Sequence, residues 1–414
     1  MSSDRDTLLR GRVADICGLD NIRDGADGDA VGGLVPPVVA SPGSPREVSE
    51  VVRAVAAAGR CLTVTGNRTA LAMGPPPRRL DVLLSTRRLN RVVEHSPGDL
   101  QVTAEAGLSL AELQRHLAGH GQRLALDVAG ERTVGGIIAA NASGPLRHRY
   151  GSVRDLLIGV QLVRADGTPA RAGGKVVKNV AGYDLCKLMT GSYGTLAVIV
   201  AATFRLHARA RASQWTRHEI DGPAGVRAVV SAYARARVEP SAIELDYDLR
   251  TGTGVVETLM EGSPPGVAAR CARVGDVLDG VAVPHPVAAT EGTADDLVLK
   301  VVVAPAAVAD TLERFHAIPP VAEGGAHVSG RAGVGVLRLT VAAPPPGSVP
   351  ALVTAVRAVA GELDGSAVVT RAPRATSADL DVWGPVRGLD LMRRVKEQFD
   401  PGGVLSPGRF VGGI

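Results

Sequence analysis

Three glycine-bearing stretches have the residue types that bind phosphate groups. They cover residues 65–70 (TGNRTA), 133–144 (TVGGIIAANASG) and 173–185 (GGKVVKNVAGYDL). A turn that presents successive backbone N–H groups binds phosphate oxygens, and a helix N-terminus adds partial positive charge. Each stretch alone is a weak signal, because glycine turns between strands and helices are common. No GxGxxG motif follows the first strand, so the Rossmann fingerprint is not met.

The elements around these stretches place two of them where a dinucleotide pyrophosphate could bind. CLTVTG reads as a buried strand that runs into the turn of residues 65–70, and TVGG stands at a helix start. Capping boxes at Ser44 and Ser109 predict helices over 45–58 and 110–119. Strands are expected near 80–84, 90–95 and 100–105, and the Asp166-Gly167 pair predicts a hairpin. This alternation favours a mixed α+β domain over a repeating βαβ array.

The region of residues 210–380 has a different pattern. Strand-like segments such as SAIELDY, DLVLKVVVAP, VGVLRLTVAAP and SAVVTRAP alternate with three amphipathic stretches that predict helices. This pattern predicts a second α+β domain on an antiparallel sheet. The chain then ends in one amphipathic helix and a tail rich in proline and glycine.

Composition excludes several classes of protein. The chain has 414 residues, of which 45% are hydrophobic and 21% charged, with a mean hydropathy of +0.13, as expected of a folded protein of two or three domains. Aromatic residues make up 3%, and basic blocks interleaved with them are missing, so we expect no nucleic-acid binding. No apolar run is long enough for a transmembrane segment, and we expect a cytoplasmic protein.

The cysteines do not have the spacing of a metal site. Cys17, Cys61, Cys186 and Cys271 are scattered and form no CxxC pair, so neither a zinc site nor an iron–sulfur cluster is predicted. His327 is a lone imidazole without carboxylate or thiolate neighbours in the sequence. We therefore expect no metal.

Taken together, the glycine stretches resemble the FAD-binding domain of the vanillyl-alcohol oxidase / p-cresol methylhydroxylase superfamily (PCMH-type). The segment GSYGTLAVI at 191–199 is similar to the later strand that supports the flavin in that family. A narrower resemblance, carried by NASGPLRHRYGSVRDLLIGV, GGKVVKNVAGYDLCKLMTGSYGTLAVI and RRVKEQFDPGGVLSPGRFVGGI, is to the E subunits of bacterial glycolate oxidases. It covers residues 35–210 and 380–414 well and the middle loosely.

The resemblance implies a set of FAD-binding positions in the first domain. Residues 65–70 become the pyrophosphate loop, although the family usually has two or three consecutive glycines where this chain has Gly66, Asn67 and Arg68. The implied positions are Thr65, Gly66, Asn67, Arg68, Thr69, Ala70, Thr133, Val134, Gly135, Gly136, Asn141, Ser143, Gly144, Gly151, Gly182, Tyr183, Gly194, Thr195 and Ile199.

The flavin is expected to be noncovalent, because the loop lacks the histidine that members with covalent flavin often carry. Asn67 tolerates a positive φ, whereas Arg68 does so at a cost of about 1 kcal/mol or more. Arg68 either supplies charge to the phosphates or is a solvated side chain.

Members that oxidise D-2-hydroxy acids carry a histidine-containing motif in the second domain. The corresponding stretch here, 330–338 (GRAGVGVLR), keeps the glycines and lacks the histidines and the acid. No catalytic residue is assigned from this stretch. Arg147, Arg149 and Arg338 are candidates for binding a substrate carboxylate, and charge on a solvent face or an interface is the alternative for the first two.

The sequence thus predicts an α+β flavoprotein with a PCMH-type FAD-binding domain of two subdomains (1–210), an α+β cap domain (211–380) and a C-terminal segment (381–414) that returns to the FAD domain. The resemblance implies the E-type subunit of a glycolate / D-2-hydroxy acid oxidase complex. Its partners would be a D-type flavoprotein and an iron–sulfur F-type subunit, with any membrane association made through them. The alternatives are a self-sufficient FAD-dependent D-2-hydroxy acid (D-lactate) dehydrogenase and a structural subunit with a degenerate flavin site.

Overall fold

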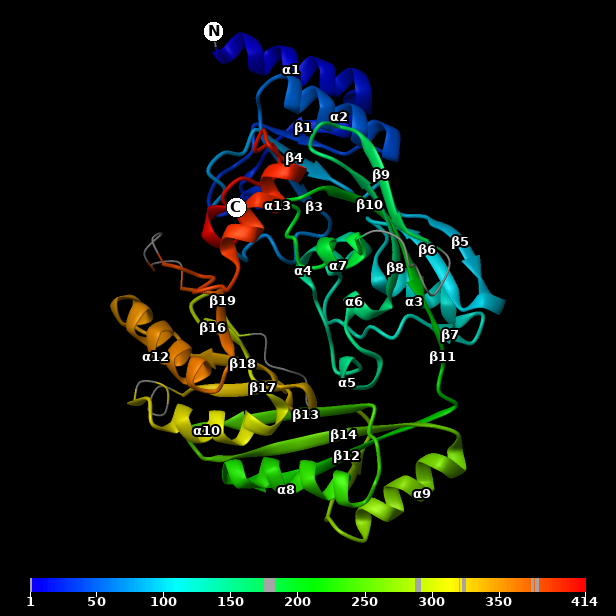
Figure 1. Ribbon diagram of the computed structural model, residues 1–414, viewed down its shortest axis with the longest axis vertical. Coiled ribbons are helices and arrows are strands. Elements are labelled where there is room, and N and C mark those ends of the chain that lie inside the picture. Colours follow the sequence, from blue (N-terminus) through cyan, green and yellow to red (C-terminus); the bar gives the residue numbers. More distant parts are fainter. Residues whose placement is uncertain are drawn as a thin grey trace. The chain divides into compact units, whose positions relative to one another are not determined.

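The computed structural model describes residues 2–174, 183–286, 292–319, 321, 325–373, 376 and 380–414. The chain divides into two compact units. Unit 1 comprises residues 1–143, 151–209 and 385–414, and unit 2 comprises residues 144–150 and 210–384. Both combine helices with sheets, which confirms the predicted α+β fold class (Figure 1). From the sequence, domain boundaries are expected after residues 210 and 380; in the structure, the two units divide after Arg209 and Gly384.

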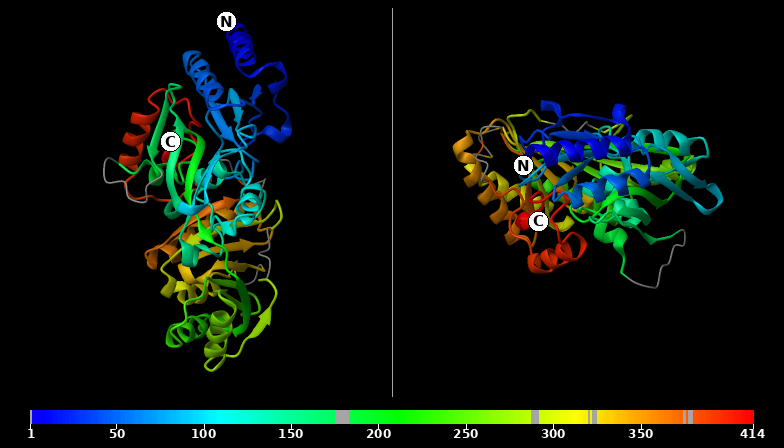
Figure 2. Two further views of the ribbon diagram at one scale, coloured as in Figure 1. Left: turned by 90° about the vertical axis from the view of Figure 1, so that its right-hand side faces the viewer. Right: turned by 90° about the horizontal axis from the view of Figure 1, so that it is seen from above.

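The first sheet of unit 1 is a mixed four-stranded sheet. Its order is β1 (Ile22–Asp24), β2 (Val38–Ala40), β4 (Val82–Ser85) and β3 (Leu62–Thr65), with β2, β4 and β3 parallel. Helices α1 (Ser2–Cys17) and α2 (Pro45–Ala57) run side by side (Figure 2) and share a buried apolar cluster with this sheet. Ser44 caps α2 by accepting the Glu47 amide at 3.2 Å, as predicted.

The second sheet of unit 1 is antiparallel. Its order is β5 (Val92–Ser96), β6 (Gln101–Glu105), β10 (Val198–Arg205), β8 (Leu157–Val163) and β9 (Pro169–Gly173). The predicted hairpin at Asp166-Gly167 joins β8 to β9. Strands β7 (Gln122–Arg123) and β11 (His207–Ala208) form a short two-stranded sheet.

Between α2 and the C-terminal segment, unit 1 contains helices α3 (Leu110–Ala118), α4 (Val134–Ala140), α6 (Val153–Leu156) and α7 (Leu185–Met189).

The C-terminal segment packs within unit 1. Helix α13 (Leu389–Phe399) is followed by a tail in which the Ser406 amide donates to the Leu62 carbonyl at 2.8 Å, and the Leu62 amide donates to the Val404 carbonyl at the same distance. The Lys396 ammonium donates to Asp400 at 2.6 Å and to the Thr195 carbonyl at 2.8 Å. These bonds hold the tail beside β3.

Unit 2 is built on one antiparallel sheet of eight strands. Its order is β15 (Val281–Val283), β12 (Ala212–Asp221), β14 (Thr253–Gly262), β13 (Ala242–Asp248), β17 (His327–Arg331), β18 (Val336–Val341), β16 (Leu297–Val302) and β19 (Ser366–Arg371). Helices α8 (Gly222–Arg235), α9 (Pro264–Gly275), α10 (Val308–His316) and α12 (Val349–Glu362) bury their apolar faces against one side of it (Figure 1). The short helix α5 (Arg147–Tyr150) also belongs to this unit.

The strands β12 and β14 and the helix α9 do not appear among the elements expected from the sequence. Among the described residues, no helix is long and apolar enough to cross a lipid bilayer.

Candidate functional site

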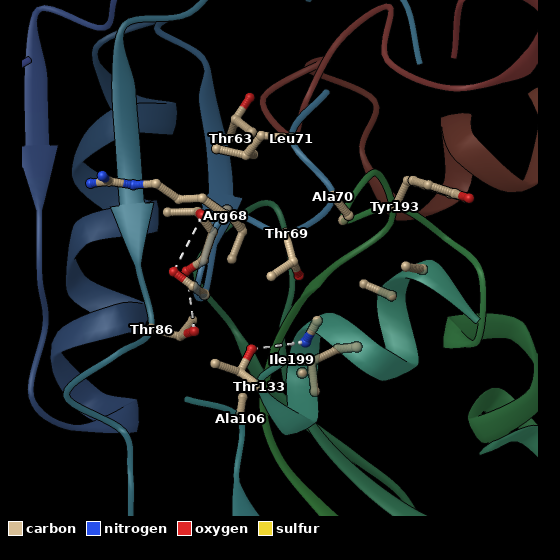
Figure 3. A pocket seen from close by; sticks show the side chains of 18 of the residues that line it. Thr63, Arg68, Thr69, Ala70, Leu71, Thr86, Ala106, Thr133, Tyr193 and Ile199 are labelled. Carbon is tan, nitrogen blue, oxygen red and sulfur yellow. Dashed lines mark hydrogen bonds between the residues drawn. The ribbon is translucent and has the colours of Figure 1, made fainter. Parts of the chain in front are cut away.

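A cavity of unit 1 lies where the end of β3 meets the start of α4 (Figure 3). Its lining comes from β3, the loop after it, α4, β10 and the C-terminal tail. The lining residues are Thr63, Val64, Thr65, Gly66, Asn67, Arg68, Thr69, Ala70, Leu71, Thr86, Ala106, Thr133, Gly135, Gly136, Ala139, Ala140, Tyr193, Gly194, Ala197, Ile199 and Arg409.

The loop of residues 66–70 presents a run of free backbone donors. Among the described residues, none accepts a hydrogen bond from the amides of Gly66 through Ala70. The loop is fixed by other bonds: the Thr65 carbonyl accepts from the Thr86 amide at 2.9 Å, and the Asn67 side chain donates to the Glu131 carbonyl at 3.0 Å. A fixed loop with unsatisfied N–H groups at a cavity is a binding site for an anion such as a pyrophosphate.

The turn of residues 133–136 is different, because its amides are already bonded. Val134 donates to the Leu108 carbonyl at 2.9 Å and Gly135 to the Ala106 carbonyl at 2.7 Å. The Gly136 amide donates to the Thr133 hydroxyl, the N-cap of α4, at 3.3 Å (Figure 3). The start of α4 therefore supplies a wall of the cavity and has no free donor at these three positions.

Two residues of the cavity wall, Gly66 and Thr63, bear on how a ligand could bind: the first keeps the loop close to α4 and the second offers a polar atom. A Cβ placed on Gly66 would lie 2.2 Å from the Thr133 hydroxyl, so only glycine fits between the loop and α4. The Thr63 hydroxyl is buried and has no hydrogen-bond partner among the described residues. A bound polar group satisfies such an atom.

The Arg68 side chain points away from Thr69 and Ala70 (Figure 3). Arg68 has a positive φ of 62°, as the loop position predicts, and it forms an ion pair with Asp29, which is 1% exposed. Arg23 binds the same carboxylate at 2.6 Å. These partners, the hydrogen bond from Arg23 first, lower the pKa of Asp29 to about 2. In this arrangement, the Arg68 side chain anchors the loop to the turn of residues 27–29, which lies between β1 and β2 in the sequence.

Arg409 is a buried cation on the cavity wall that sequence reasoning missed. Its side chain donates to the carbonyls of Pro75 at 2.7 Å, Leu71 at 2.8 Å and Met73 at 2.6 Å, so it holds the chain that follows the loop. Burial lowers the pKa of Arg409 to about 10. Phe410 stacks on Tyr193 with ring centroids 5.5 Å apart. Arg409 belongs to the sequence SPGRF at residues 406–410, and nothing in that pattern predicts that the arginine is buried.

The sequence-predicted positions fall into three groups. Those that line the cavity are Thr65, Gly66, Asn67, Arg68, Thr69, Ala70, Thr133, Gly135, Gly136, Gly194 and Ile199. Those that lie in unit 1 but do not line it are Val134, Asn141, Ser143, Gly151, Tyr183 and Thr195. Gly144 lies in unit 2, and Gly182 lies outside the described residues.

Three members of the second group have other surroundings. The Thr195 hydroxyl is buried and donates to the Ser192 carbonyl at 2.7 Å. Tyr183 is 96% exposed. Asn141 ends α4 with a positive φ of 47°.

In unit 2, cations collect on the side of the sheet opposite the apolar helices. Lys300 on β16 and Arg338 on β18 are direct cross-strand partners, and Ser329 on β17 is the next partner of Arg338. Arg331 shares this face and lies 4.0 Å from Glu244. Burial first, and then Arg147 and Arg331, lower the pKa of Lys300.

Arg147 and Arg149 separate on helix α5. Arg147 acts electrostatically on the half-buried Lys300, whereas Arg149 is exposed, with its guanidinium 5.9 Å from the Tyr150 ring centroid. The structure therefore brings Arg147 and Arg338 to the same cationic group, which we call the Lys300 cluster (Arg147, Lys300, Arg331 and Arg338), and leaves Arg149 outside it.

The stretch of residues 330–338 forms the β17–β18 hairpin. Gly335 has a positive φ of 64°, and a Cβ there would lie 2.0 Å from the Val303 carbonyl oxygen. His327 lies before the turn, with its Nε2 2.9 Å from Asp246. His148 of α5 lies against Gly333, where burial lowers the pKa of the imidazole. No pattern in the sequence predicts that His148 meets this hairpin.

Comparisons with known proteins agree with this geometry. Residues 36–173 match the family described as FAD binding domain. The chain is 28% identical over 423 residues to an uncharacterized FAD-linked oxidoreductase of Mycobacterium tuberculosis, which covers 91% of both chains. It is 35% identical over 188 residues to the glycolate oxidase subunit GlcE of Escherichia coli, which covers 44% of this chain and 51% of that subunit.

A solved structure of alkyldihydroxyacetonephosphate synthase has the same fold. It superposes with a TM-score of 0.72 at 17% identity, over 97% of this chain and 84% of that one. This likeness concerns the fold alone. With the family match, the predicted cofactor, FAD, and the predicted class, an FAD-dependent oxidoreductase, are confirmed.

Proposed function

Starting from an FAD-binding domain in an oxidoreductase chain, we propose that this protein is the E-type flavin subunit of a glycolate / D-2-hydroxy acid oxidase complex. Its partners in this proposal are a D-type flavoprotein and an iron–sulfur F-type subunit, and its location is the cytoplasm. The likeness to GlcE supports the subunit assignment over 44% of the chain.

The observation that carries the cofactor site is the run of free amides at residues 66–70. We propose that these N–H groups bind the FAD pyrophosphate, and that Gly66 keeps the loop close to Thr133. The remaining cavity residues of β10 and α4, among them Ile199 and Gly135, line the space for the rest of the cofactor. When bound, FAD supplies the two-electron acceptor for the oxidation of a 2-hydroxy acid to a 2-oxo acid.

The flavin is held without a covalent bond in this proposal. Neither histidine nor cysteine is present among the residues that line the cavity. Acid precipitation of the purified protein is expected to leave all yellow colour in the supernatant. Flavin that stays in the pellet would show a covalent link and contradict the proposal.

The Lys300 cluster is proposed to bind a carboxylate. Lys300, Arg331 and Arg338 share one polar face of the unit 2 sheet, and burial first, then Arg147 of α5 and Arg331, lower the pKa of Lys300. A bound anion would offset both the burial of the Lys300 ammonium and the repulsion between the neighbouring cations. A 2-hydroxy acid carries such a carboxylate, and bidentate recognition by Arg338 or Arg147 suits its planar geometry.

Two features favour a need for partner subunits. The hairpin of residues 330–338 lacks the histidines that would orient a hydroxy acid and accept its proton. The four cysteines, which are free, lie at scattered positions in the sequence and do not supply the four thiolates of an iron–sulfur cluster. Electrons would therefore leave through another chain.

The second candidate is a self-sufficient D-2-hydroxy acid dehydrogenase, and His148 favours it. This imidazole lies against the hairpin, and burial lowers its pKa, so it is neutral at pH 7 and can accept a proton. In that case Lys300, Arg147 and His148 would form a substrate site without a partner's histidines.

Dye-linked oxidation of glycolate and D-lactate separates the two. We expect the isolated, flavin-saturated protein to have a kcat/KM far below that of the reconstituted complex. Comparable values would contradict the subunit proposal and favour the dehydrogenase. His148→Gln in the isolated protein then tests the proton acceptor, with the exposed His285→Gln as the control.

A further inference from the structure

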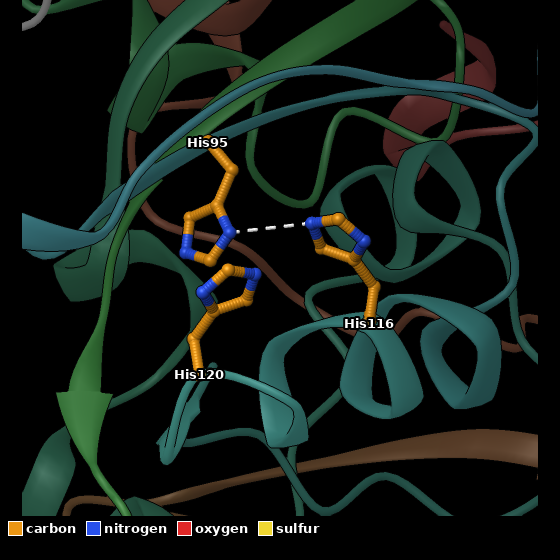
Figure 4. A group of neighbouring side chains, drawn as sticks. All are labelled: His95, His116 and His120. Carbon is orange, nitrogen blue, oxygen red and sulfur yellow. Dashed lines mark hydrogen bonds between the residues drawn. The ribbon is translucent and has the colours of Figure 1, made fainter.

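Three histidines from separate elements of unit 1 meet away from the FAD cavity (Figure 4). His95 lies on β5, His116 in the last turn of α3, and His120 in the turn that follows. One ring nitrogen of each lies within 4.8 Å of the others. The His116 Nε2 is 3.2 Å from the His95 Nδ1. None of the three lines the cavity described above.

Gln122 fixes the tautomer of His95. The Gln122 side-chain nitrogen donates to the Pro97 carbonyl at 2.7 Å, which can only accept, so the amide orientation is determined. The Gln122 oxygen then lies 2.9 Å from the His95 Nε2, which must carry the proton and donate. The His95 Nδ1 is left with a lone pair that faces the other two rings. This is the arrangement in which an outer hydrogen bond orients a metal-ligating imidazole.

The backbone holds the three rings in place. His95 pairs with Val102 in the β5–β6 ladder. His116 is on a helix whose N-terminus is capped by Ser109, and the His120 amide donates to the Leu117 carbonyl at 3.0 Å. Gly121, with a positive φ of 66°, allows the chain to turn directly after His120. The ligands thus come from a strand, a helix and a tight turn.

Two of the three imidazoles of this group are open to solvent. His116 and His120 are exposed, so an ion can reach the site and keep a coordination position for water.

We propose that His95, His116 and His120 bind a divalent transition metal, with zinc as the best-fitting ion. Zinc takes imidazole nitrogens at about 2.0–2.1 Å in tetrahedral geometry, which places neighbouring ligand atoms about 3.3 Å apart. The His95–His116 nitrogen separation of 3.2 Å matches this edge. Small rotations of the exposed His120 ring bring the third nitrogen to the same ion, which would join β5 to the end of α3.

Titration of the tag-free full chain with Zn²⁺ alone tests the site. After chelator treatment, we expect one ion per chain in equilibrium dialysis and a rise in Tm. His116→Gln and His120→Gln, both at exposed positions, are each expected to lower the affinity at least about tenfold. Gln122→Leu is expected to lower it about 10- to 100-fold through the loss of ring orientation. FAD content should be unchanged in all of them.

His285→Gln is the matched control, since it removes one exposed imidazole in unit 2. It is expected to leave Zn²⁺ affinity unchanged. Cobalt substitution should give the intense visible bands of a tetrahedral site in the wild-type chain and not in His116→Gln. Failure to bind Zn²⁺ below about 100 μM, or equal loss in His285→Gln, would overturn the proposal.

Discussion

The loop of residues 66–70 and the turn of residues 133–136 line the same cavity, and their backbone amides are in opposite states. The loop amides find no acceptor among the described residues, whereas Leu108, Ala106 and Thr133 accept from the turn. Both segments contain glycine; the loop follows β3, and the turn begins α4. A glycine turn has N–H groups to offer a phosphate only where the surrounding chain supplies no acceptors for them, so glycine content alone does not distinguish the two segments.

The largest effect is expected from Gly66→Ala. The new Cβ would lie 2.2 Å from the Thr133 hydroxyl and push the loop from α4. Overpacking of this kind costs about 1–3 kcal/mol, so we expect FAD affinity to fall about 10- to 100-fold. A titration that follows flavin fluorescence measures the FAD affinity. Gly98→Ala is the control, because a Cβ there meets nothing within 4 Å. An equal loss of FAD affinity in Gly98→Ala would show that the contact between position 66 and Thr133 is not the cause.

Arg409→Lys should weaken the support behind the loop. Lysine keeps the charge but has no planar fork to reach the carbonyls of Leu71, Met73 and Pro75 together. We expect the free energy of unfolding to fall by about 2 kcal/mol, with a smaller loss of FAD affinity. Urea denaturation measures the stability. Wild-type stability in this variant would show that Arg409 does not hold the segment.

Asp29→Asn tests the anchor of Arg68. The folded pKa of Asp29, about 2, lies below the ordinary 3.8, so its contribution is present above pH 4 and is lost as the pH falls toward 2. We expect the variant to be less stable by about 2 kcal/mol at pH 7, with the gap narrowing below pH 4. Asp24→Asn, at an exposed ion pair, should show a much smaller gap. A gap for Asp29→Asn that stays constant down to pH 2 would contradict this account.

The smallest effect is expected from Gly136→Ala. The Gly136 amide is already bonded to Thr133, and a Cβ there would lie 3.0 Å from the same hydroxyl. We expect FAD affinity to stay within about threefold, which is about 0.6 kcal/mol. A loss as large as that of Gly66→Ala would make the two turns equivalent and abolish the distinction between them.

Local signals in the sequence predicted much of unit 1. The helix caps at Ser44 and Ser109 and the Asp166-Gly167 hairpin depend on a few neighbouring residues, so the local sequence is enough to predict them. The long strands β12 and β14 were missed because their polar and apolar residues are set by their places in an eight-stranded sheet, where buried His218 meets the Tyr233 hydroxyl and buried Glu257 pairs with Arg217. Propensity does not report such placement.

The site residues that were missed depend on contacts between distant parts of the chain. Arg409 meets residues 71–75 across more than three hundred positions, and His95 meets His116 and His120 only when β5 lies beside α3. The state of an amide, free or bonded, depends in the same way on which carbonyls the fold brings near. Sequence reasoning could therefore locate the loop at 65–70 but not separate it from the turn at 133–136.

A crystal structure of the FAD-loaded protein would show which backbone amides bind the pyrophosphate. We expect at least two amide nitrogens of residues 66–70 within about 3.2 Å of pyrophosphate oxygens, and we expect the amides of Val134 and Gly135 to keep their bonds to the carbonyls of Leu108 and Ala106. A pyrophosphate bound by the amides of residues 134–136, with the loop of residues 66–70 away from it, would contradict the account.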